Sequence, residues 1–301
     1  MINAFALLSV TALLQTPSEA RSPPTFSMDV EAVQVDVSVS RSGRPVAGLS
    51  AADFVVLDSG VPQQVQLAAA GDVPVNAILL LDTSASLLGE RMTYLRAAAS
   101  AFVAGLRTGD RVALVTFSHR VRVLSGLTLE LAAVRERLGR AYADGMTALS
   151  DALYAGFGIA EGAAGRTVLV LFSDGLDNIS WLSESAILDL ARSSPATVYV
   201  VAASLPGGNG GDRAHLGRDP REAFLKALVG ATGGALLKAR GDAELAQAFE
   251  QALSEMRARY VLQYTPEGVA PSGWHPIEVR LKSRKAELTT RPGYFKAAGP
   301  R

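Results

Sequence analysis

Cysteine is absent from the 301-residue sequence. Disulfide bonds, thiolate metal sites and cysteine nucleophiles are therefore excluded, and any bound metal ion must be held by oxygen or imidazole ligands. A surplus of basic residues is also absent, because 29 Lys and Arg residues are balanced by 29 Asp and Glu residues. Nucleic-acid binding normally requires a basic surface, so we expect no nucleic-acid partner.

Long hydrophobic runs are lacking beyond the amino terminus. No later segment approaches the roughly 20 apolar residues of a membrane-spanning helix, so we expect no transmembrane span in the mature chain. The apolar run within residues 1–14 is followed by Ser18-Glu19-Ala20, which resembles a small-x-small cleavage site. We therefore expect a signal peptide over residues 1–20 and an exported protein, which is periplasmic, cell-surface or secreted. The alternatives are an uncleaved anchor and a disordered apolar leader.

The two flanks of the chain, residues 25–72 and 259–297, carry the pattern of β-strands. Alternate residues from Val33 to Val39 are valines, a period of two that indicates a half-buried strand. Further strands are predicted at 54–57 and 65–68, with Asp58-Ser59-Gly60 supplying the reversal between them, and at 260–264, 277–281 and 291–295. Because neither flank alone is large enough to bury a core, we expect the two flanks to pair into one small β-sandwich.

The central part, residues 74–258, alternates buried strands with amphipathic helices. Residues 77–81 form a continuous apolar run, as expected of a strand buried on both faces of a parallel sheet. Other strands are predicted at 112–117, 167–172 and 198–203, an edge strand at 121–124, and helix starts at Pro220 and after Asp242. This alternation predicts a doubly wound α/β sheet flanked by helices, whose ligands bind outside the carboxyl ends of the strands.

Three predicted loops at these carboxyl ends carry oxygen-bearing side chains. The first is Asp82-Thr83-Ser84-Ala85-Ser86, the second contains Thr147 just before a helix, and the third is Ser173-Asp174-Gly175. The candidate metal ligands are Asp82, Ser84, Ser86, Thr147 and Asp174. Carboxylate and hydroxyl oxygens suit a hard cation, so we expect Mg²⁺, or Mn²⁺, at this edge of the sheet.

The three loops resemble the metal-ion-dependent adhesion site of von Willebrand factor type A domains, over about residues 75–259. This resemblance implies a six-stranded, mostly parallel, Rossmann-like sheet. It also implies that Ser84 and Ser86 contact the metal directly, that Thr147 does so in the ligand-bound state, and that the two aspartates act largely through water. The flanks look like an exported bacterial subgroup related to this family.

The resemblance further implies how the site recognises a partner. Neutral hydroxyls next to the cation leave its charge poorly neutralised, so an outside carboxylate is attracted. The expected partner is therefore a protein that supplies an Asp or Glu side chain to complete the coordination. Asp177, Trp181 and His119 are candidates for the partner-binding rim, although capping, packing and solvated-hairpin roles are the alternatives for them.

Three functions remain open from the sequence. The first is a non-enzymatic, cation-dependent protein-binding or adhesion module. The second is a metal-assisted hydrolase, against which stands the lack of His, Lys and Glu inside the three loops, so no catalytic residue is predicted. The third is a structural envelope scaffold in which the metal only stabilises the domain. The glycine-rich stretch 207–211 lacks the Lys and Ser/Thr of a phosphate-binding loop and is interpreted as a flexible connection.

Overall fold

The computed structural model describes residues 32–42, 44–68, 73–203, 220–239, 242–282 and 285–296. The expected signal peptide over residues 1–20 and the glycine-rich stretch 207–211 lie outside the described residues. Among the described residues, no helix combines the length and the apolar character that crossing a membrane requires.

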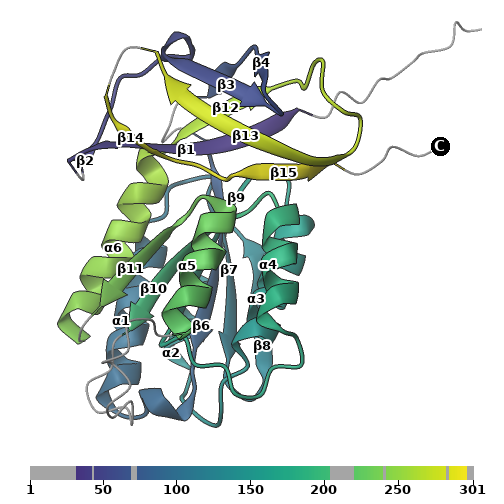
Figure 1. The fold of residues 1–301 in the computed structure, drawn as a ribbon. Helices are drawn as coiled ribbons and strands as arrows, with labels where there is room; N and C mark the ends of the chain where they lie inside the picture. Colours follow the sequence, from purple (N-terminus) through teal and green to yellow (C-terminus); the bar gives the residue numbers. More distant parts are fainter. Residues whose placement is uncertain are drawn as a thin grey trace, which may run out of the picture. The chain divides into compact units, whose positions relative to one another are not determined.

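A six-stranded sheet occupies the central part of the chain (Figure 1). Its strands are β6 (Val75–Asp82), β7 (Arg111–Phe117), β8 (Val121–Thr128), β9 (Arg166–Ser173), β10 (Thr197–Ala203) and β11 (Ala235–Ala239). They lie in the order β11-β10-β9-β6-β7-β8, and β8 is the antiparallel edge strand. The predicted α/β fold with a mostly parallel sheet is therefore confirmed.

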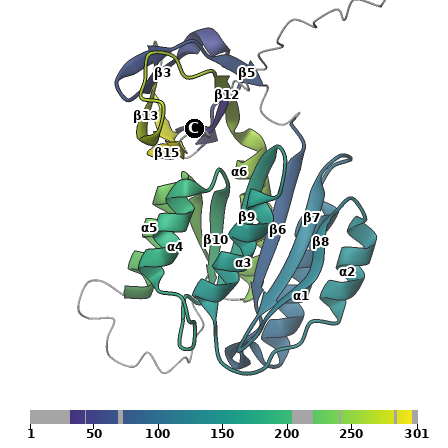
Figure 2. The ribbon, with the colours of Figure 1, turned by 90° about the vertical axis from the view of Figure 1, so that its right-hand side faces the viewer.

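Helices cover both faces of this sheet (Figure 2). They are α1 (Glu90–Ala104), α2 (Leu131–Gly139), α3 (Leu149–Glu161), α4 (Glu184–Ser193), α5 (Pro220–Thr232) and α6 (Asp242–Ala258). Helices α1, α2 and α6 pack on one face, and α3, α4 and α5 pack on the other. Successive side chains of β6 pack alternately into the cores on the two faces of the sheet. Both faces are buried, which explains why the apolar run is unbroken.

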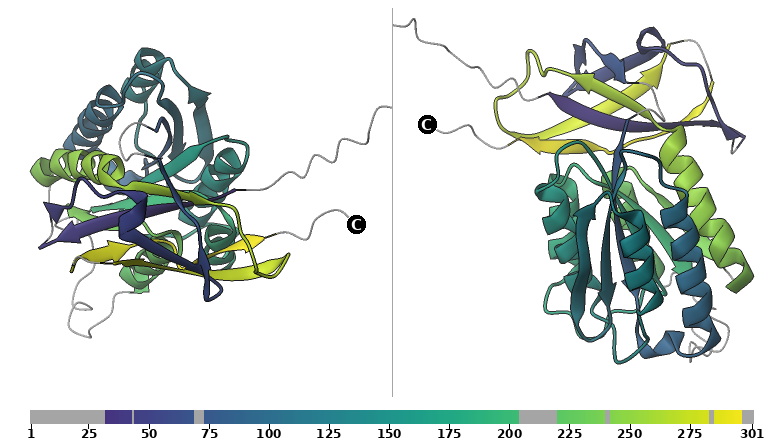
Figure 3. Two further views of the ribbon diagram at one scale, coloured as in Figure 1. Left: turned by 90° about the horizontal axis from the view of Figure 1, so that it is seen from above. Right: turned by 180° about the vertical axis from the view of Figure 1, so that it is seen from behind.

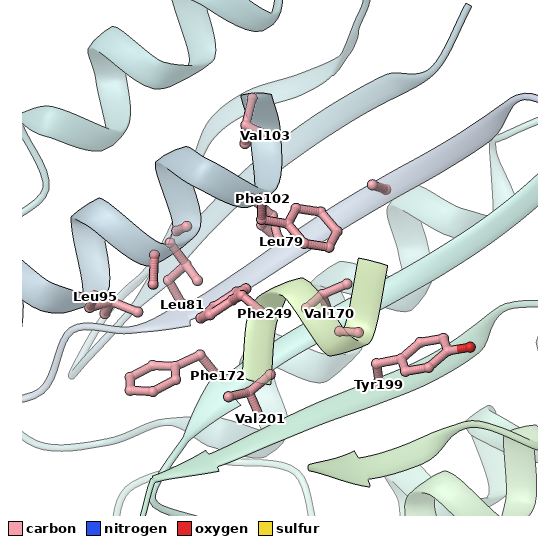
Figure 4. Packing of buried hydrophobic residues seen from close by; sticks show 14 of the residues in the cluster. Leu79, Leu81, Leu95, Phe102, Val103, Val170, Phe172, Tyr199, Val201 and Phe249 are labelled. Atoms are coloured by element: carbon pink, nitrogen blue, oxygen red, sulfur yellow. The ribbon is translucent and has the colours of Figure 1, made fainter. Parts of the chain in front are cut away.

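The core on the α1 and α6 face contains a group of aromatic rings. Phe249 of α6 lies with its ring centroid 6.0 Å from that of Phe102 on α1 and 6.2 Å from that of Phe172 on β9. Figure 4 shows these rings among the aliphatic side chains of the sheet. Contacts of this kind fix the last helix of the domain against the strand that leads to Asp174.

The flanks of the chain form two further sheets that share one core. The first sheet contains β1 (Val33–Arg41), β2 (Arg44–Pro45), β5 (Gln66–Ala68), β12 (Tyr260–Tyr264) and β14 (Glu287–Thr289). The second contains β3 (Phe54–Asp58), β4 (Val61–Gln63), β13 (Gly273–Leu281) and β15 (Gly293–Lys296), and a short 3₁₀ turn, Ala51–Asp53, leads into β3. Each sheet joins strands of both flanks, β1 with β12 and β3 with β13. Figure 3 shows the purple and blue strands of the first flank beside the yellow strands of the second.

The hairpin after β3 differs from the one expected. The turn at Ser59 and Gly60, which have φ values of 51° and 83°, leads into β4 and not into the predicted strand at 65–68. Two consecutive residues with positive φ are what a tight type I′ hairpin requires. The sequence does not predict β4, because Pro62 argues against a strand. Proline is tolerated at the edge of a sheet, and β4 is an edge strand. The segment Gln66–Ala68 is instead an edge strand against β12.

A buried polar cluster ties the second sheet to β12. The carboxylate of Asp58 accepts hydrogen bonds from the hydroxyls of Tyr264 at 2.9 Å and Tyr294 at 2.8 Å, and from Ser59 at 3.1 Å. His275 Nδ1 lies 3.0 Å from the same carboxylate. Burial raises the pKa of Asp58, but the hydrogen bonds from Tyr294, Tyr264, His275 and Ser59 outweigh burial, so the pKa lies below its ordinary value.

Candidate metal site

Two of the three predicted site loops begin at the carboxyl ends of adjacent strands, and the remaining one ends at a helix start. Asp82 is the last residue of β6, and the 3₁₀ turn Ala85–Leu87 follows it and contains Ser86. Asp174 follows β9 directly, and β9 pairs in parallel with β6. Thr147 lies two residues before α3. The parallel pairing therefore places the first and third loops at the same edge of the sheet.

Backbone hydrogen bonds connect the three loops. Ala85 N–H donates to the carbonyl oxygen of Gly145 at 2.9 Å, which joins the first loop to the second. Asn178 N–H donates to the carbonyl oxygen of Thr147 at 3.1 Å, and Asn178 Oδ1 accepts from Thr147 N–H at 2.8 Å. These bonds hold Thr147 between the loops that carry Ser84 and Asp174.

The side chains of the first loop form a compact group of oxygens. Ser84 Oγ lies 3.0 Å from Ser86 Oγ, and Asp82 Oδ1 accepts a hydrogen bond from Ser84 N–H at 2.9 Å. Asp82 Oδ2 accepts another from Ser173 Oγ at 2.8 Å. Asp82 is 1% exposed. Its carboxylate is thus fixed in orientation by two different loops.

The electrostatics of Asp82 are unfavourable without a compensating positive charge. The pKa of Asp82 is raised to about 6. Burial is the largest cause, the negative charge of Asp174 acts in the same direction, and hydrogen bonds from Ser84 and Ser173 oppose the rise. Two carboxylates that repel each other at a buried edge are the charge pattern that a bound cation relieves.

The residues therefore fit a hard cation by the chemistry of their donors. The five positions offer two carboxylates and three hydroxyls, all of them oxygen ligands. Among the residues that the structure describes, no group of three or more His, Cys, Asp or Glu side chains is arranged to hold a metal ion. A cation here would depend on the serine and threonine hydroxyls as well as on the two aspartates.

Asp177 and Ser173 both have structural roles at this edge. The hydrogen bonds of Asp177 correspond to the capping role given as the alternative to a rim role, whereas the role of Ser173 was not predicted from the sequence. Asp177 Oδ2 accepts from Ser150 N–H at 2.9 Å, at the first turn of α3, and Asp177 Oδ1 accepts from Ser180 N–H at 3.2 Å. Ser173 Oγ accepts from Gly175 N–H at 3.0 Å while it donates to Asp82. Ser173 and Asn178, neither of which was a predicted site residue, thus orient predicted ligands. Their position within four residues of Asp174 was the only sequence signal.

The other rim candidates lie on exposed segments, His119 in the turn between β7 and β8 and Trp181 between β9 and α4. His119 packs against Gly145, where φ is +65° and a Cβ would overlap the imidazole ring. Trp181 is 96% exposed, and its N–H donates to the carboxylate of Asp151 at 3.2 Å. Asp151, which lies in the first turn of α3, therefore holds the segment that presents Trp181.

Comparisons with known proteins agree with this architecture. Residues 77–176 match the model of the von Willebrand factor type A domain. Among curated proteins, the uncharacterized protein sll0103 of Synechocystis sp. is 30% identical over 122 residues, which cover 36% of this chain and 29% of that protein. The chain thus matches less than a third of the length of this relative.

Solved structures share the fold at low sequence identity. A von Willebrand factor type A protein from Catenulispora acidiphila has a TM-score of 0.53 at 14% identity, over 90% of this chain and 76% of that chain. The PilB minor pilin from Streptococcus sanguinis has a TM-score of 0.52 at 14% identity, over 64% of this chain and 63% of that chain. Residues 77–176 therefore match the von Willebrand factor type A domain family, and the six-stranded sheet shares the fold of these solved structures.

Proposed function

We propose that this chain is a divalent-cation-dependent module that binds another protein through a carboxylate of that protein. The residues that would hold Mg²⁺ or Mn²⁺ are Asp82, Ser84, Ser86, Thr147 and Asp174. A bound cation supplies the positive charge that draws in an acidic side chain. The observation that carries the proposal is the buried carboxylate of Asp82, which is oriented by Ser84 and Ser173 and repelled by Asp174.

Apolar side chains around this edge support a protein as the ligand. Leu88, Met146 and Leu176, one on each site loop, are 63%, 50% and 38% exposed. Exposed apolar side chains next to a polar centre are common at protein–protein interfaces. Each of the three candidate ligands Ser86, Thr147 and Asp174 thus has an exposed apolar side chain within two residues in the sequence.

The same residues support binding and not catalysis. The three loops contain no His, Lys or Glu that would serve as a general base. Export of the chain to the periplasm, the cell surface or the medium belongs to the proposal, and the pattern of residues 1–20 supports it. The fold shared with a protein named as a minor pilin is compatible with that location.

Calorimetric titration of the purified chain with MgCl₂ and MnCl₂ tests the cation site. We expect saturable uptake by the wild type and none by Asp82→Ala, because the substitution removes one of two carboxylates. Asp189→Ala is the matched control, since Asp189 is an exposed residue of α4 that pairs with Arg192. The absence of uptake by the wild type would overturn the proposal.

Capture of partners from an envelope extract then separates the three functions. Capture with Mg²⁺ that is lost with EDTA and with Asp82→Ala supports the binding module. Capture that is independent of metal favours the scaffold, and metal-dependent turnover of phosphate or ester substrates favours the hydrolase.

A further inference from the structure

A pocket of about 170 Å³ lies beside the candidate metal site. The residues of its wall that matter here are Thr83, Arg122, Leu124, Arg137, Arg140 and Tyr142. Thr83 lies in the chain between Asp82 and Ser84, so one wall of the pocket is part of the first site loop. The pocket and the cation position are therefore neighbours.

The loop that closes the pocket is also the second site loop. Tyr142 lies at its start and Thr147 at its end, and Asp144 N–H between them donates to the carbonyl oxygen of Thr83 at 2.8 Å. The opposite wall comes from β8, which supplies Arg122, and from α2, whose carboxyl end supplies Arg137. Whatever enters the pocket thus contacts the loops that position the candidate metal ligands.

The pocket carries a surplus of positive charge. Arg122 donates to the hydroxyl of Tyr142 at 2.8 Å and lies 5.3 Å from the centre of that ring, and Arg137 donates to the carbonyl oxygen of Leu124 at 2.7 Å. These acceptors are neutral, so neither bond compensates a guanidinium charge. Each guanidinium carries five N–H donors, more than these bonds use.

Two carboxylates offset part of this charge. Glu136 pairs with Arg140 at 2.6 Å, with both side chains exposed, and the charge of Asp144 acts on Arg122. Three guanidinium groups against two carboxylates leave the pocket positive. Leu124 and the ring of Tyr142 add apolar walls, which suit the methylene groups of an acidic side chain more than a bare inorganic anion.

We propose that this arginine pocket binds a second carboxylate of the partner segment whose first carboxylate is taken at the cation site. The inference rests on the proposed function and specifies its partner, which is an acidic protein segment with at least two nearby Asp or Glu residues. An extended segment advances about 3.3 Å per residue, so a few residues span two neighbouring positions.

Fluorescence anisotropy with labelled hexaglutamate, and with hexaglutamine as the uncharged probe, tests the pocket on the full chain. We expect the Arg122→Gln, Arg140→Gln double variant to bind hexaglutamate about tenfold more weakly than the wild type, equivalent to about 1.4 kcal/mol. The matched control is Arg135→Gln, Arg280→Gln, which loses the same two charges from exposed positions outside the pocket. The control is expected to stay within about twofold of the wild type.

The titration is repeated with EDTA and with Asp82→Ala, so that the cation site and the arginine pocket are tested independently of each other. If the pocket variant and the control bind hexaglutamate equally while EDTA weakens binding, the arginine pocket is overturned and the cation site stands. If EDTA has no effect while the pocket variant binds more weakly, the proposed function fails and the pocket is supported. No saturable binding of hexaglutamate to the wild type, with or without binding of inorganic phosphate, overturns the acidic-segment inference.

Discussion

Replacing Arg166 by Met is expected to destabilise the protein by about 3 kcal/mol. Arg166 Nε lies 2.6 Å from Asp36 Oδ2, and the two side chains are only 1% and 10% exposed. Arg166 Nη2 also donates to the carbonyl oxygen of Met256 at 2.7 Å. Methionine removes these donors and leaves a buried carboxylate without its partner, which costs about 3–5 kcal/mol. The lower end applies because Arg291 also interacts with the charge of Asp36.

Urea unfolding followed by tryptophan fluorescence measures this loss. The control is Arg192→Met, because Arg192 lies at the same 2.6 Å from Asp189 but the side chains are 50% and 76% exposed. An exposed pair contributes about 0.5 kcal/mol, so the control is expected to lose no more than that. The double variant with Asp36→Val should recover most of the stability, because it removes the uncompensated charge. Equal losses in Arg166→Met and the control would refute the reasoning that burial, and not distance, determines the cost.

Three further substitutions test other parts of the structure. Gly145→Ala is expected to weaken Mg²⁺ uptake about fivefold or more in calorimetry. A positive φ costs alanine about 1–2 kcal/mol, and the added Cβ would overlap the ring of His119. Unchanged uptake would contradict the role of this loop. Asp58→Asn should reduce the loss of stability on acidification. The lowered pKa of Asp58 adds stability that is complete above about pH 4 and disappears as the pH falls through the folded-state pKa. If the urea midpoint of the variant falls between pH 5 and pH 3 as much as that of the wild type does, this role of Asp58 is contradicted. Gly234→Ala should lower the free energy of unfolding in urea by about 2 kcal/mol or more, because its Cβ would overlap the carbonyl group of Val198. Gly158→Ala, on the open side of α3, should raise it by about 0.5–1 kcal/mol. A similar effect of both substitutions would contradict the close contact at Gly234.

The parallel core of the sheet was predictable because its strands are buried on both faces. The runs at 77–81 and 167–172 stand out as apolar segments, and Pro220 marks the start of α5 through its fixed φ. The strand β11 was not located, since Ala235–Ala239 is short, contains no β-branched residue and lies at the edge of the sheet. Strand β8 extends to Thr128, four residues beyond its predicted end, because Ser125 and Gly126 look like turn residues but lie at an irregularity in its pairing with β7.

The candidate ligands were identifiable because each lies directly beside a strong local signal. Asp82 and Asp174 end buried strands, and Thr147 precedes a helix. The roles of Ser173 and Asn178 were not predictable, because they depend on how the loops fold over one another after the sheet has formed. The arginine pocket was not predictable for the same reason, because it depends on the folded arrangement. Arg122 and Arg140 are 18 residues apart in sequence and line one pocket only because β8 returns antiparallel to β7.

Stability and the proposed cation binding should be separable, because the residues concerned lie at opposite ends of the same strands. Arg166, which pairs with Asp36 of β1, is the first residue of β9, and Asp174 follows the last. The two residues are eight positions apart along an extended strand, about 26 Å at 3.3 Å per residue. Arg291 also bonds near a strand start, through the carbonyl oxygen of Ser194 at 2.9 Å, shortly before β10 begins. Because the polar bonds between the sandwich strands and the α/β sheet lie at the amino ends of the strands, Arg166→Met should lower stability while folded protein keeps the Mg²⁺ affinity of the wild type.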